Sequence, residues 1–372
     1  MSAAYDVLIL GGGGAGCSAA LHLARRGARV ALFERGLVGS QASGVNYGGV
    51  RQNGRHPAEL PIARRAREIW ARLPELIGTD SEFEVTGHLK LARSAEEEAE
   101  LAAYMEVARA HDFPLELIGA NRLRERWPWL GQRVVAGAFA PEDGAANPRL
   151  LAPAFAQAAR AAGAEINERT PVDEIAHDGA AFVVTHGGRS WRAPVALNCM
   201  GYWGGAIAAR FGEPVPVAPL APNMLVSEPI PYFIEPNMGV VGGDIYLRQI
   251  RRGNVIFGGG RGACDPDTPW ARPLPEATLA AMARAVELVP RLAGIHVIRS
   301  WTGIDGEMPD GLPVIGPSRT TPGLIHAFGF SGHGFMLGPG IGAILADLML
   351  DGRTDVPLEP FRIDRFALGS AS

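Results

Sequence analysis

Hydrophobic residues near the N-terminus form two short runs, separated by a glycine-rich turn and a stretch with helical spacing. The first run, Tyr5–Leu10, has the composition of a buried parallel strand. The spacing of Cys17–Arg26 predicts a helix that stops at Gly27, a residue suited to the left-handed position after a helix end. Ala28–Phe33 predicts a second strand. This order of strand, helix and strand indicates an α/β domain that opens with a nucleotide-binding unit.

The turn before the predicted helix carries glycines at the three positions of a G-x-G-x-x-G motif, Gly11, Gly13 and Gly16. The first permits a tight turn, the second lets the backbone approach a pyrophosphate, and the third lets the helix pack on the strand. The helix N-terminus supplies free N–H groups to phosphates. Glu34, at the end of the second strand, can accept hydrogen bonds from a ribose diol, which favours FAD or NAD over NADP. A ligand-free turn is the alternative, and the order of the elements argues against it.

The middle of the chain has a different pattern. Strand-like runs occur at Met224–Ser227, Asp244–Ile250 and Asn254–Gly258, and Arg252–Asn254 predicts a turn between the last two. An earlier segment, Ser94–His111, predicts a charged helix. The alternation suits a mostly antiparallel sheet, one face of which would cover the cofactor.

Composition excludes several classes of function. The 372 residues are 47% hydrophobic and 20% charged with a net charge of −4, which argues against a chain built to bind nucleic acid or an anionic membrane. The cysteines, Cys17, Cys199 and Cys264, are far apart, so neither a metal site nor a disulfide framework is expected. Ile341–Leu350 is short for a membrane span and contains Asp347. We expect no signal peptide, no membrane span and a cytoplasmic location.

Four segments resemble one known family. They are Gly39–Gln52, Leu197–Trp203, Thr302–Gly316 with its PDGLPVIG element, and Phe328–Leu337 with its GFSGHGF element, after which a helix is predicted at Gly338–Leu350. Together they resemble the D-amino-acid-oxidase-like (DAO) superfamily of FAD-dependent amine oxidoreductases, which includes glycine oxidase, sarcosine oxidases and D-hydroxyproline or opine dehydrogenases. Gly39–Gln52 resembles the segment that wraps the flavin in this superfamily and is called the flavin-wrapping segment. The residues of the last two segments are most similar to those of the β subunits of the multisubunit members.

The resemblance implies an α/β fold with two domains. One is a FAD-binding Rossmann-like domain of the GR2 type, and the other is a substrate domain built on a mostly antiparallel β-sheet. Because the cofactor motifs lie at both ends and in the middle of the chain, the FAD-binding domain would be discontinuous. We assign residues 1–85, 140–215 and 300–372 to it, and residues 86–139 and 216–299 to the substrate domain.

The resemblance also implies where FAD binds. Gly303 stands where monomeric sarcosine oxidases carry the cysteine that tethers the flavin, so noncovalent FAD is expected. The C-terminal glycines would let main chain approach the flavin ring, with the following helix N-terminus near its N1 and C2 carbonyl. The implied contacts are Gly11, Gly13, Gly14, Ala15, Gly16, Glu34, Arg35, Ala42, Ser43, Asn46, Gly48, Gly49, Val50, Val172, Gly201, Trp203, Gly311, Gly332, Gly334, Phe335 and Met336.

In this family an amine substrate loses a Cα hydride to flavin N5, and water hydrolyses the imine. The protein then needs mainly to position the substrate, so a clamp for a carboxylate is expected. Asp305 stands where glycine-oxidase-like members have an arginine, and Met336 where monomeric sarcosine oxidases have a lysine. These departures leave the simple glycine or sarcosine assignment open.

Replacement candidates for substrate contact are Arg51, Tyr246, Arg248 and His333. Tyr246 and Arg248 are two apart on a predicted strand, so both side chains would share one face. Arg51 lies near the end of the flavin-wrapping segment and could reach the substrate or the cofactor. His333 would pack beside the flavin or act directly. Structural roles remain open for each, and Asp305 and Glu307 could instead recognise a cationic substrate group.

The leading hypothesis is a FAD-dependent enzyme that oxidises the C–N bond of a small secondary amine or D-amino acid. One alternative is a flavoprotein that oxidises a C–O bond, as in a 2-hydroxy acid or glycerol phosphate, because the same fold hosts several chemistries. Another is a flavin-binding subunit that is active only within a complex. Electron-transfer partner subunits would be needed if the enzyme is a dehydrogenase, because this chain has no cluster ligands of its own.

Overall fold

The computed structural model describes residues 5–366 and places the first apolar run at the centre of a six-stranded sheet. Every residue of β1 is buried, as expected of a strand covered on both faces. Neighbouring strands are parallel except at one edge, where β22 runs antiparallel to β23. In spatial order the strands are β22 (Val314–Pro317), β23 (Leu324–Phe328), β12 (Val195–Asn198), β1 (Val7–Leu10), β2 (Val30–Phe33) and β8 (Glu165–Asn167).

Helices cover one face of this sheet. The predicted first helix is α1 (Gly14–Arg25), and Gly27 follows it with φ +86°, which confirms the predicted stop. It packs between α7 (Pro148–Ala161) and α10 (Gly334–Asp351), with α3 (Leu60–Trp70) beyond α10. Contact between α1 and α10 is very close, since a Cβ on Gly342 would lie 2.2 Å from the Ser18 hydroxyl. The two helices therefore meet through small residues.

The opposite face carries a small antiparallel sheet of β9 (Glu174–His177), β10 (Phe182–His186) and β11 (Arg189–Ala193). Phe182 and Trp191 of this sheet pack on Leu8 and Leu10 of β1. The central sheet is therefore covered on both faces, which explains why its strands read as continuous apolar runs. This is the layered architecture expected for the cofactor domain.

Helix α10 is longer than the sequence pattern predicted, because it begins at Gly334 and not at Gly338. By length and apolar composition this helix is long enough to cross a membrane, so the expectation that the segment is too short is wrong. Two thirds of the helix is buried inside the protein, however, as is usual for a core helix.

The second large sheet has eight strands. All neighbouring pairs are antiparallel except β4 and β15, which run parallel. The predicted hairpin is present between β16 and β17, with Gly253 at φ +101° in its turn. In spatial order the strands are β20 (Val297–Trp301), β14 (Pro222–Pro229), β17 (Asn254–Arg261), β16 (Tyr246–Gln249), β15 (Asn237–Val240), β4 (His88–Ala92), β6 (Ala136–Ala140) and β5 (Glu116–Gly119).

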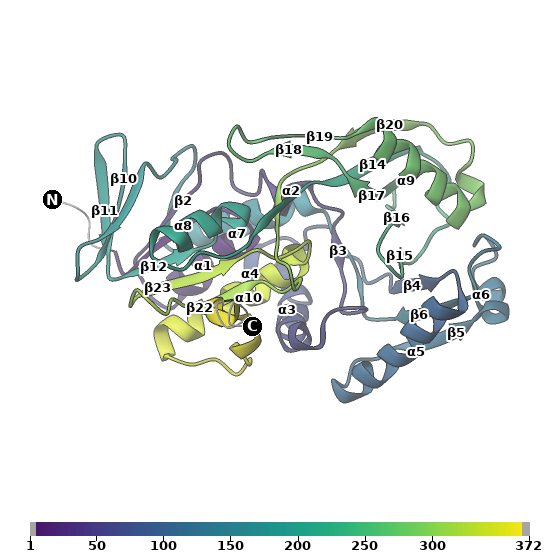
Figure 1. Cartoon of the computed structure of the whole chain (residues 1–372), viewed down its shortest axis with the longest axis horizontal. Coiled ribbons are helices and arrows are strands. Elements are labelled where there is room, and N and C mark those ends of the chain that lie inside the picture. The colour runs from purple at the N-terminus through teal and green to yellow at the C-terminus, as the bar shows by residue number, and fades with distance from the viewer. Residues whose placement is uncertain (1–4, 367–372) are drawn as a thin grey trace.

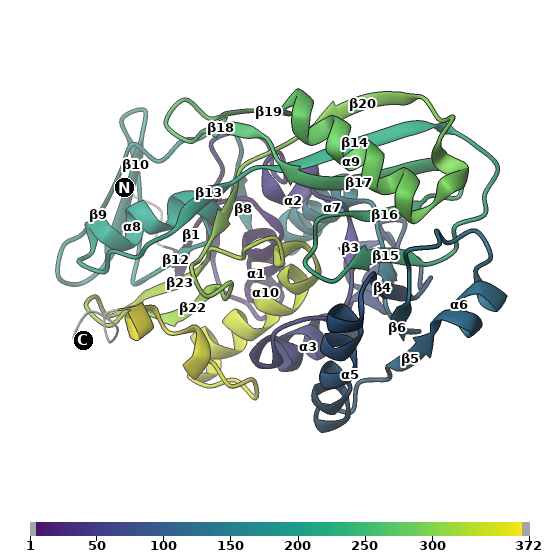
Figure 2. The same ribbon diagram turned by 45° about the vertical axis from the view of Figure 1, so that its right-hand side comes forward.

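Three helices pack on this sheet: α9 (Pro275–Leu288), α5 (Ala95–Ala110) and α6 (Ala120–Arg126). The two large sheets lie side by side (Figures 1 and 2). The predicted charged helix is α5, with the Ser94 hydroxyl accepting from the Glu97 amide at its start. The strands of the second sheet fall within residues 88–140 and 222–301. The exact domain boundaries stay a prediction.

The remaining elements of the described chain are short. They are α2 (Ala42–Val45), β3 (Gly49–Val50), η1 (Pro57–Glu59), α4 (Leu73–Ile77), β7 (Gly144–Ala145), η2 (Gly201–Trp203), α8 (Gly204–Arg210), β13 (Ala218–Leu220), β18 (Ala263–Asp265), β19 (Trp270–Arg272), η3 (Pro290–Leu292), β21 (Asp305–Glu307), η4 (Glu359–Phe361) and η5 (Ile363–Phe366).

Candidate active site

A cavity of about 820 Å³ lies between the two sheets. Its floor is formed at the carboxyl ends of β1, β2 and β12, where ligands bind in open parallel sheets. Residues of β14, β16 and β17, among them Met224, Tyr246 and Gly260, form its roof. The volume is within the range of cofactor and substrate pockets. The second sheet therefore covers the cavity as the sequence pattern suggested.

The glycine motif forms one end of this cavity. Gly11 has φ +101°, and a Cβ there would lie 2.4 Å from the Cys199 carbonyl oxygen, so only glycine fits the turn. The Gly14 amide donates to the Ser43 hydroxyl at 2.9 Å. Glu34 accepts from the amides of Gly12 at 2.9 Å and Gly36 at 2.8 Å. These bonds hold the Glu34 carboxylate beside the glycine turn while leaving lone pairs for a ligand hydroxyl.

Arg35 and Trp203 are paired at the same end. The Arg35 guanidinium carbon lies 3.6 Å from the centroid of the Trp203 ring, and the ring N–H donates to the Pro266 carbonyl at 3.1 Å. Nη2 of Arg35 is buried and has no hydrogen-bond partner within the described chain. An unpaired buried N–H is costly unless a ligand satisfies it. The arrangement fits an anionic, aromatic dinucleotide such as FAD.

Most of the residues predicted to contact a cofactor line this cavity. They are Gly11, Gly13, Gly14, Ala15, Glu34, Arg35, Ala42, Ser43, Asn46, Gly48, Gly49, Val172, Gly201, Trp203, Gly332, Gly334 and Phe335. The flavin-wrapping segment owes its shape to Asn46. Its side-chain amide donates to the carbonyls of Ala42 and Ser43, and its oxygen accepts from the Gly48 amide at 2.7 Å.

Four predicted contacts lie outside the cavity wall. A Cβ on Gly16 would lie 2.1 Å from the Gly11 carbonyl oxygen, so Gly16 serves helix packing. Val50 and Met336 are buried in the core beneath the wall, and Gly311 occupies a turn at φ +72°. These four are not among the residues that line the cavity, and their direct contact with the cofactor stays a prediction.

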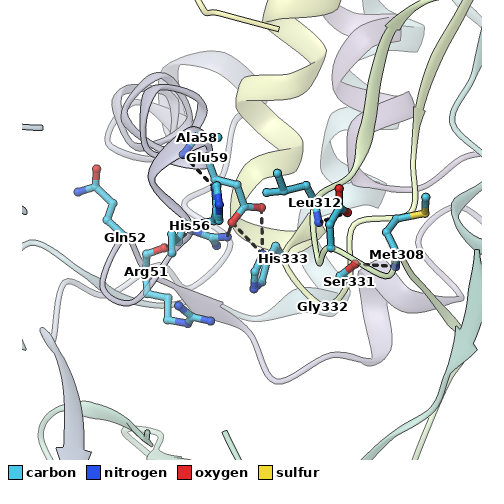
Figure 3. Close-up of polar contacts among 12 residues, drawn as sticks. Arg51, Gln52, His56, Ala58, Glu59, Met308, Leu312, Ser331, Gly332 and His333 are labelled. Atoms are coloured by element: carbon cyan, nitrogen blue, oxygen red, sulfur yellow. Dashed lines mark hydrogen bonds and ion pairs between the residues drawn. The ribbon is translucent and has the colours of Figure 1, made fainter. Parts of the chain in front are cut away.

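Another part of the cavity wall holds a group of charged side chains (Figure 3). Arg51 and His333 both line it, and Figure 3 shows the Arg51 guanidinium and the His333 ring extending towards the same side. Nη1 of Arg51 donates to the Asn53 carbonyl at 2.6 Å. Behind them, Arg55 and Glu59 are almost fully buried, and Arg55 donates through Nε to the Arg51 carbonyl at 2.7 Å. Two of the predicted candidates are thus brought together.

Tyr246 and Arg248 do not act as a pair. Tyr246 lines the cavity, with its hydroxyl 3.2 Å from the Met224 sulfur, and burial raises its pKa so that it stays a donor. Arg248 is buried outside the cavity wall, where its guanidinium donates to the carbonyls of Tyr47 at 3.0 Å and Ala146 at 2.9 Å. The prediction that Arg248 reaches the substrate is corrected, because its guanidinium is bound to these two carbonyls and does not line the cavity.

Asp305 and Glu307, the acids near the start of the segment Thr302–Gly316, already have hydrogen-bond or ion-pair partners. Asp305 lines the cavity and accepts from the amides of Gly306 at 2.8 Å and Gly332 at 2.9 Å. Burial raises its pKa above the ordinary value. Glu307 forms a two-pronged ion pair with Arg261, both contacts at 2.8 Å. Within residues 5–366 there is no cluster of three potential metal ligands.

Comparisons with known proteins agree with this geometry. Residues 6–348 match the family model described as DAO, FAD dependent oxidoreductase. The chain belongs to the DAO family of FAD-dependent oxidoreductases. It is 30% identical over 374 residues to glycine oxidase of Geobacillus kaustophilus, covering 98% of each chain. It is 28% identical to sarcosine oxidase subunit beta of Arthrobacter, covering 98% of this chain and 92% of the relative.

Among solved structures, the L-proline dehydrogenase from P. horikoshii superposes with a TM-score of 0.91 at 27% identity, covering 99% of both chains. This DAO-family chain is therefore a FAD-dependent oxidoreductase of the group that oxidises amines and amino acids.

Sequence reasoning missed two residues next to Arg51 and His333, namely Arg55 and Glu59. They follow the flavin-wrapping segment, and Pro57 opens a helical turn between them. Their i, i+4 spacing is the signal that could have indicated an ion pair. Tyr47 and Tyr202, which lie within two of the family-like segments, also line the cavity.

Proposed function

We propose that this chain oxidises the C–N bond of a small secondary amine or amino acid that carries a carboxylate. The observation that supports it is that Arg51 and His333 line the same cavity as the dinucleotide-binding residues, and that the predicted flavin contacts Gly332 and Gly334 flank His333. A guanidinium is suited to bind a carboxylate through two parallel hydrogen bonds. A substrate held there would lie between these side chains and the cofactor.

FAD, when held noncovalently in this cavity, would act as the two-electron acceptor for the substrate Cα hydride. The chain supplies position and charge. The N–H groups of Arg51 that the Asn53 carbonyl does not use would bind the substrate carboxylate. The neutral Tyr246 hydroxyl would donate to the same group or face the substrate from the roof. Water then hydrolyses the imine product to an oxo acid and an amine or ammonia.

An anaerobic absorbance titration tests the proposal. The purified protein would be mixed with sarcosine, glycine, D-proline, cis-4-hydroxy-D-proline, an opine and a 2-hydroxy acid in turn. We expect the flavin band to bleach with one of the amines and not with the hydroxy acid. Bleaching by the 2-hydroxy acid alone would establish C–O oxidation instead. A flavin band that no compound bleaches would indicate a subunit that is inactive without partners.

The acceptor of the electrons is tested in the same cuvette. Two relatives carry the name sarcosine oxidase subunit beta, so we propose that partner subunits could receive the electrons from this chain. After bleaching, admission of air would restore the flavin band rapidly in an oxidase. A slow return, accelerated by an artificial dye acceptor, would support a dehydrogenase that works with partner subunits.

A further inference from the structure

Glu59 and His333 form a buried contact at the end of the cavity (Figure 3). Nδ1 of His333 lies 2.9 Å from the Glu59 carboxylate, although 274 residues separate the two in the chain. Glu59 is fully buried at the end of η1, and His333 is the residue before α10. Nη1 of Arg55 lies 3.6 Å from the same carboxylate. Two elements of the cofactor domain thus place a carboxylate directly behind a cavity-lining histidine.

This contact determines which ring nitrogen of His333 carries the proton. A carboxylate accepts, so Nδ1 must be the donor and Nε2 keeps its lone pair in the neutral ring. Within residues 5–366, Nε2 has no hydrogen-bond partner, and the side chain is 23% exposed where it borders the cavity. A carboxylate that orients an imidazole in this way is the arrangement that activates a histidine as a proton acceptor.

The surrounding charges keep the pair in this state near neutral pH. Burial lowers the pKa of His333, and the neighbouring Arg55 and Arg51 lower it further, against the opposing effect of Glu59. Burial alone would raise the pKa of Glu59, but the contacts with His333, Arg55 and Arg51 outweigh it and hold the pKa below its usual value. Asp305 adds a carboxylate on the adjoining segment, where it accepts from the Gly332 amide. His333 is therefore neutral and Glu59 ionised at neutral pH.

No other acid in the described cavity wall is as well placed to accept a proton. Glu34 lies at the dinucleotide end, and Glu307 is paired with Arg261. Asp244 is paired with Arg93 and Arg284. The Asp305 carboxylate accepts from two backbone amides. His333 is the histidine that lines the cavity beside Arg51.

We propose that Nε2 of His333 accepts a proton from the substrate ammonium group, and that Glu59 is the positioning residue that makes this possible. In this step an N–H bond of the substrate breaks and an Nε2–H bond forms, while the electron pair stays on the amine nitrogen. The neutral amine is the form from which a Cα hydride can leave. The inference rests on the proposed function, which supplies the amine substrate.

The first test measures the ring directly and needs no substrate. Long-range ¹H–¹⁵N spectra of the holoprotein labelled with ¹⁵N-histidine would report the tautomer and titration of His333, assigned by its loss in His333→Ala. We expect the Nδ1–H tautomer in the wild type and a fall of about one unit in the His333 pKa in Glu59→Gln, which removes the charge. Glu59→Asp keeps the charge and should keep the wild-type titration more closely. A wild-type Nε2–H tautomer would overturn the proposal.

The second test uses the amine that bleaches the flavin. In Glu59→Gln the acidic limb of kcat/KM should move to lower pH and the plateau kcat should fall, with KM little changed. His333→Ala should lower kcat/KM at neutral pH by about 100-fold or more. It should then recover in proportion to the fraction of neutral amine as pH rises, because the substrate arrives without its extra proton. A His333→Ala profile parallel to the wild type would overturn the proposal.

The two tests fail separately. If no amine bleaches the flavin, the proposed function fails, and the spectra still report whether Glu59 fixes the tautomer. If an amine is oxidised and His333→Ala keeps the wild-type pH profile, only the proton-transfer proposal fails. Should Glu59→Gln not fold because Arg55 loses its partner, His333→Ala and Glu59→Asp still decide the question.

Discussion

The guanidinium carbon of Arg35 lies 3.6 Å from the centroid of the Trp203 ring, so a cation is stacked on an aromatic face at the edge of the dinucleotide site. Arg35 follows the second strand of the nucleotide-binding unit, whereas Trp203 follows β12. The pair therefore joins two of the loops that would surround FAD. Nη2 of Arg35 is buried without a hydrogen-bond partner among residues 5–366, and we propose that a bound dinucleotide supplies one.

Replacement of Arg35 should weaken FAD binding. In Arg35→Gln the stacked cation and its free N–H are both lost, which corresponds to about 1–2 kcal/mol and a Kd roughly tenfold higher. Arg35→Lys keeps the charge but not the planar stack and should fall between the two. Quenching of FAD fluorescence by the apoprotein measures the Kd. An unchanged Kd in Arg35→Gln would show that this residue does not contact the cofactor.

Replacement of Arg51 should weaken substrate binding more than cofactor binding. Loss of a charge-assisted carboxylate contact is worth about 1.5–3 kcal/mol, so Arg51→Gln should raise KM by roughly 10- to 100-fold. Arg51→Lys should recover part of the loss. Arg353→Gln is the matched control, since Arg353 is exposed and lies outside the cavity wall. If Arg51→Gln instead lowers flavin content with KM intact, Arg51 binds the cofactor.

Local sequence patterns predicted the first strand, the glycine turn, the helix and the second strand, because these parts lie within a few dozen residues. Gly11, Gly13 and Gly16 lie in or next to the turn between β1 and α1, and Glu34 follows β2 directly. The sequence therefore contains all the parts of this unit in one short stretch. The period of two in β16 set Tyr246 and Arg248 on the same face of the sheet. This period could not predict that Arg248 would donate its hydrogen bonds to carbonyl oxygens in distant segments.

The contact between Glu59 and His333 could not be predicted from the sequence either, because the two residues are 274 positions apart. Each residue sits at the start of a different helix, and only the packing of α3 against α10 brings them together. The parallel pairing of β4 with β15 is a similar case, because those strands are far apart in sequence. Motifs specify local turns, whereas tertiary packing decides which charged groups become neighbours.

Gly303 should resist replacement because of Val45. A Cβ at Gly303 would lie 2.2 Å from Cγ2 of Val45, and the Val45 carbonyl accepts from the Trp301 ring at 2.7 Å. Gly303→Ala should therefore destabilise the holoprotein by about 1–3 kcal/mol through overpacking. Adding Val45→Ala should restore part of that loss, which a double-mutant cycle of unfolding free energies would measure. Strictly additive effects would contradict the predicted clash.

Asp143 should make stability depend on pH. It is fully buried just before β7 and accepts from the amides of Gln52 and Asn53, and burial raises its pKa to about 6. A folded-state pKa above the unfolded value of 3.8 means that the stabilising contribution of the protonated group is complete below pH 3.8. It is lost as pH rises through about 6, which amounts to roughly 3 kcal/mol for a shift of this size.

Asp143→Asn removes that titration while keeping an oxygen acceptor. The free energy of unfolding of the wild type relative to the variant should therefore fall between pH 4 and pH 6 and level off above pH 7, as urea denaturation at a series of pH values would show. Asn can satisfy only one of the two amides through its oxygen, which offsets the curve without changing its shape. A difference that stays constant from pH 4 to pH 7 would mean that Asp143 is ionised throughout, held so by the charges of Arg51 and Arg55, which lower its pKa.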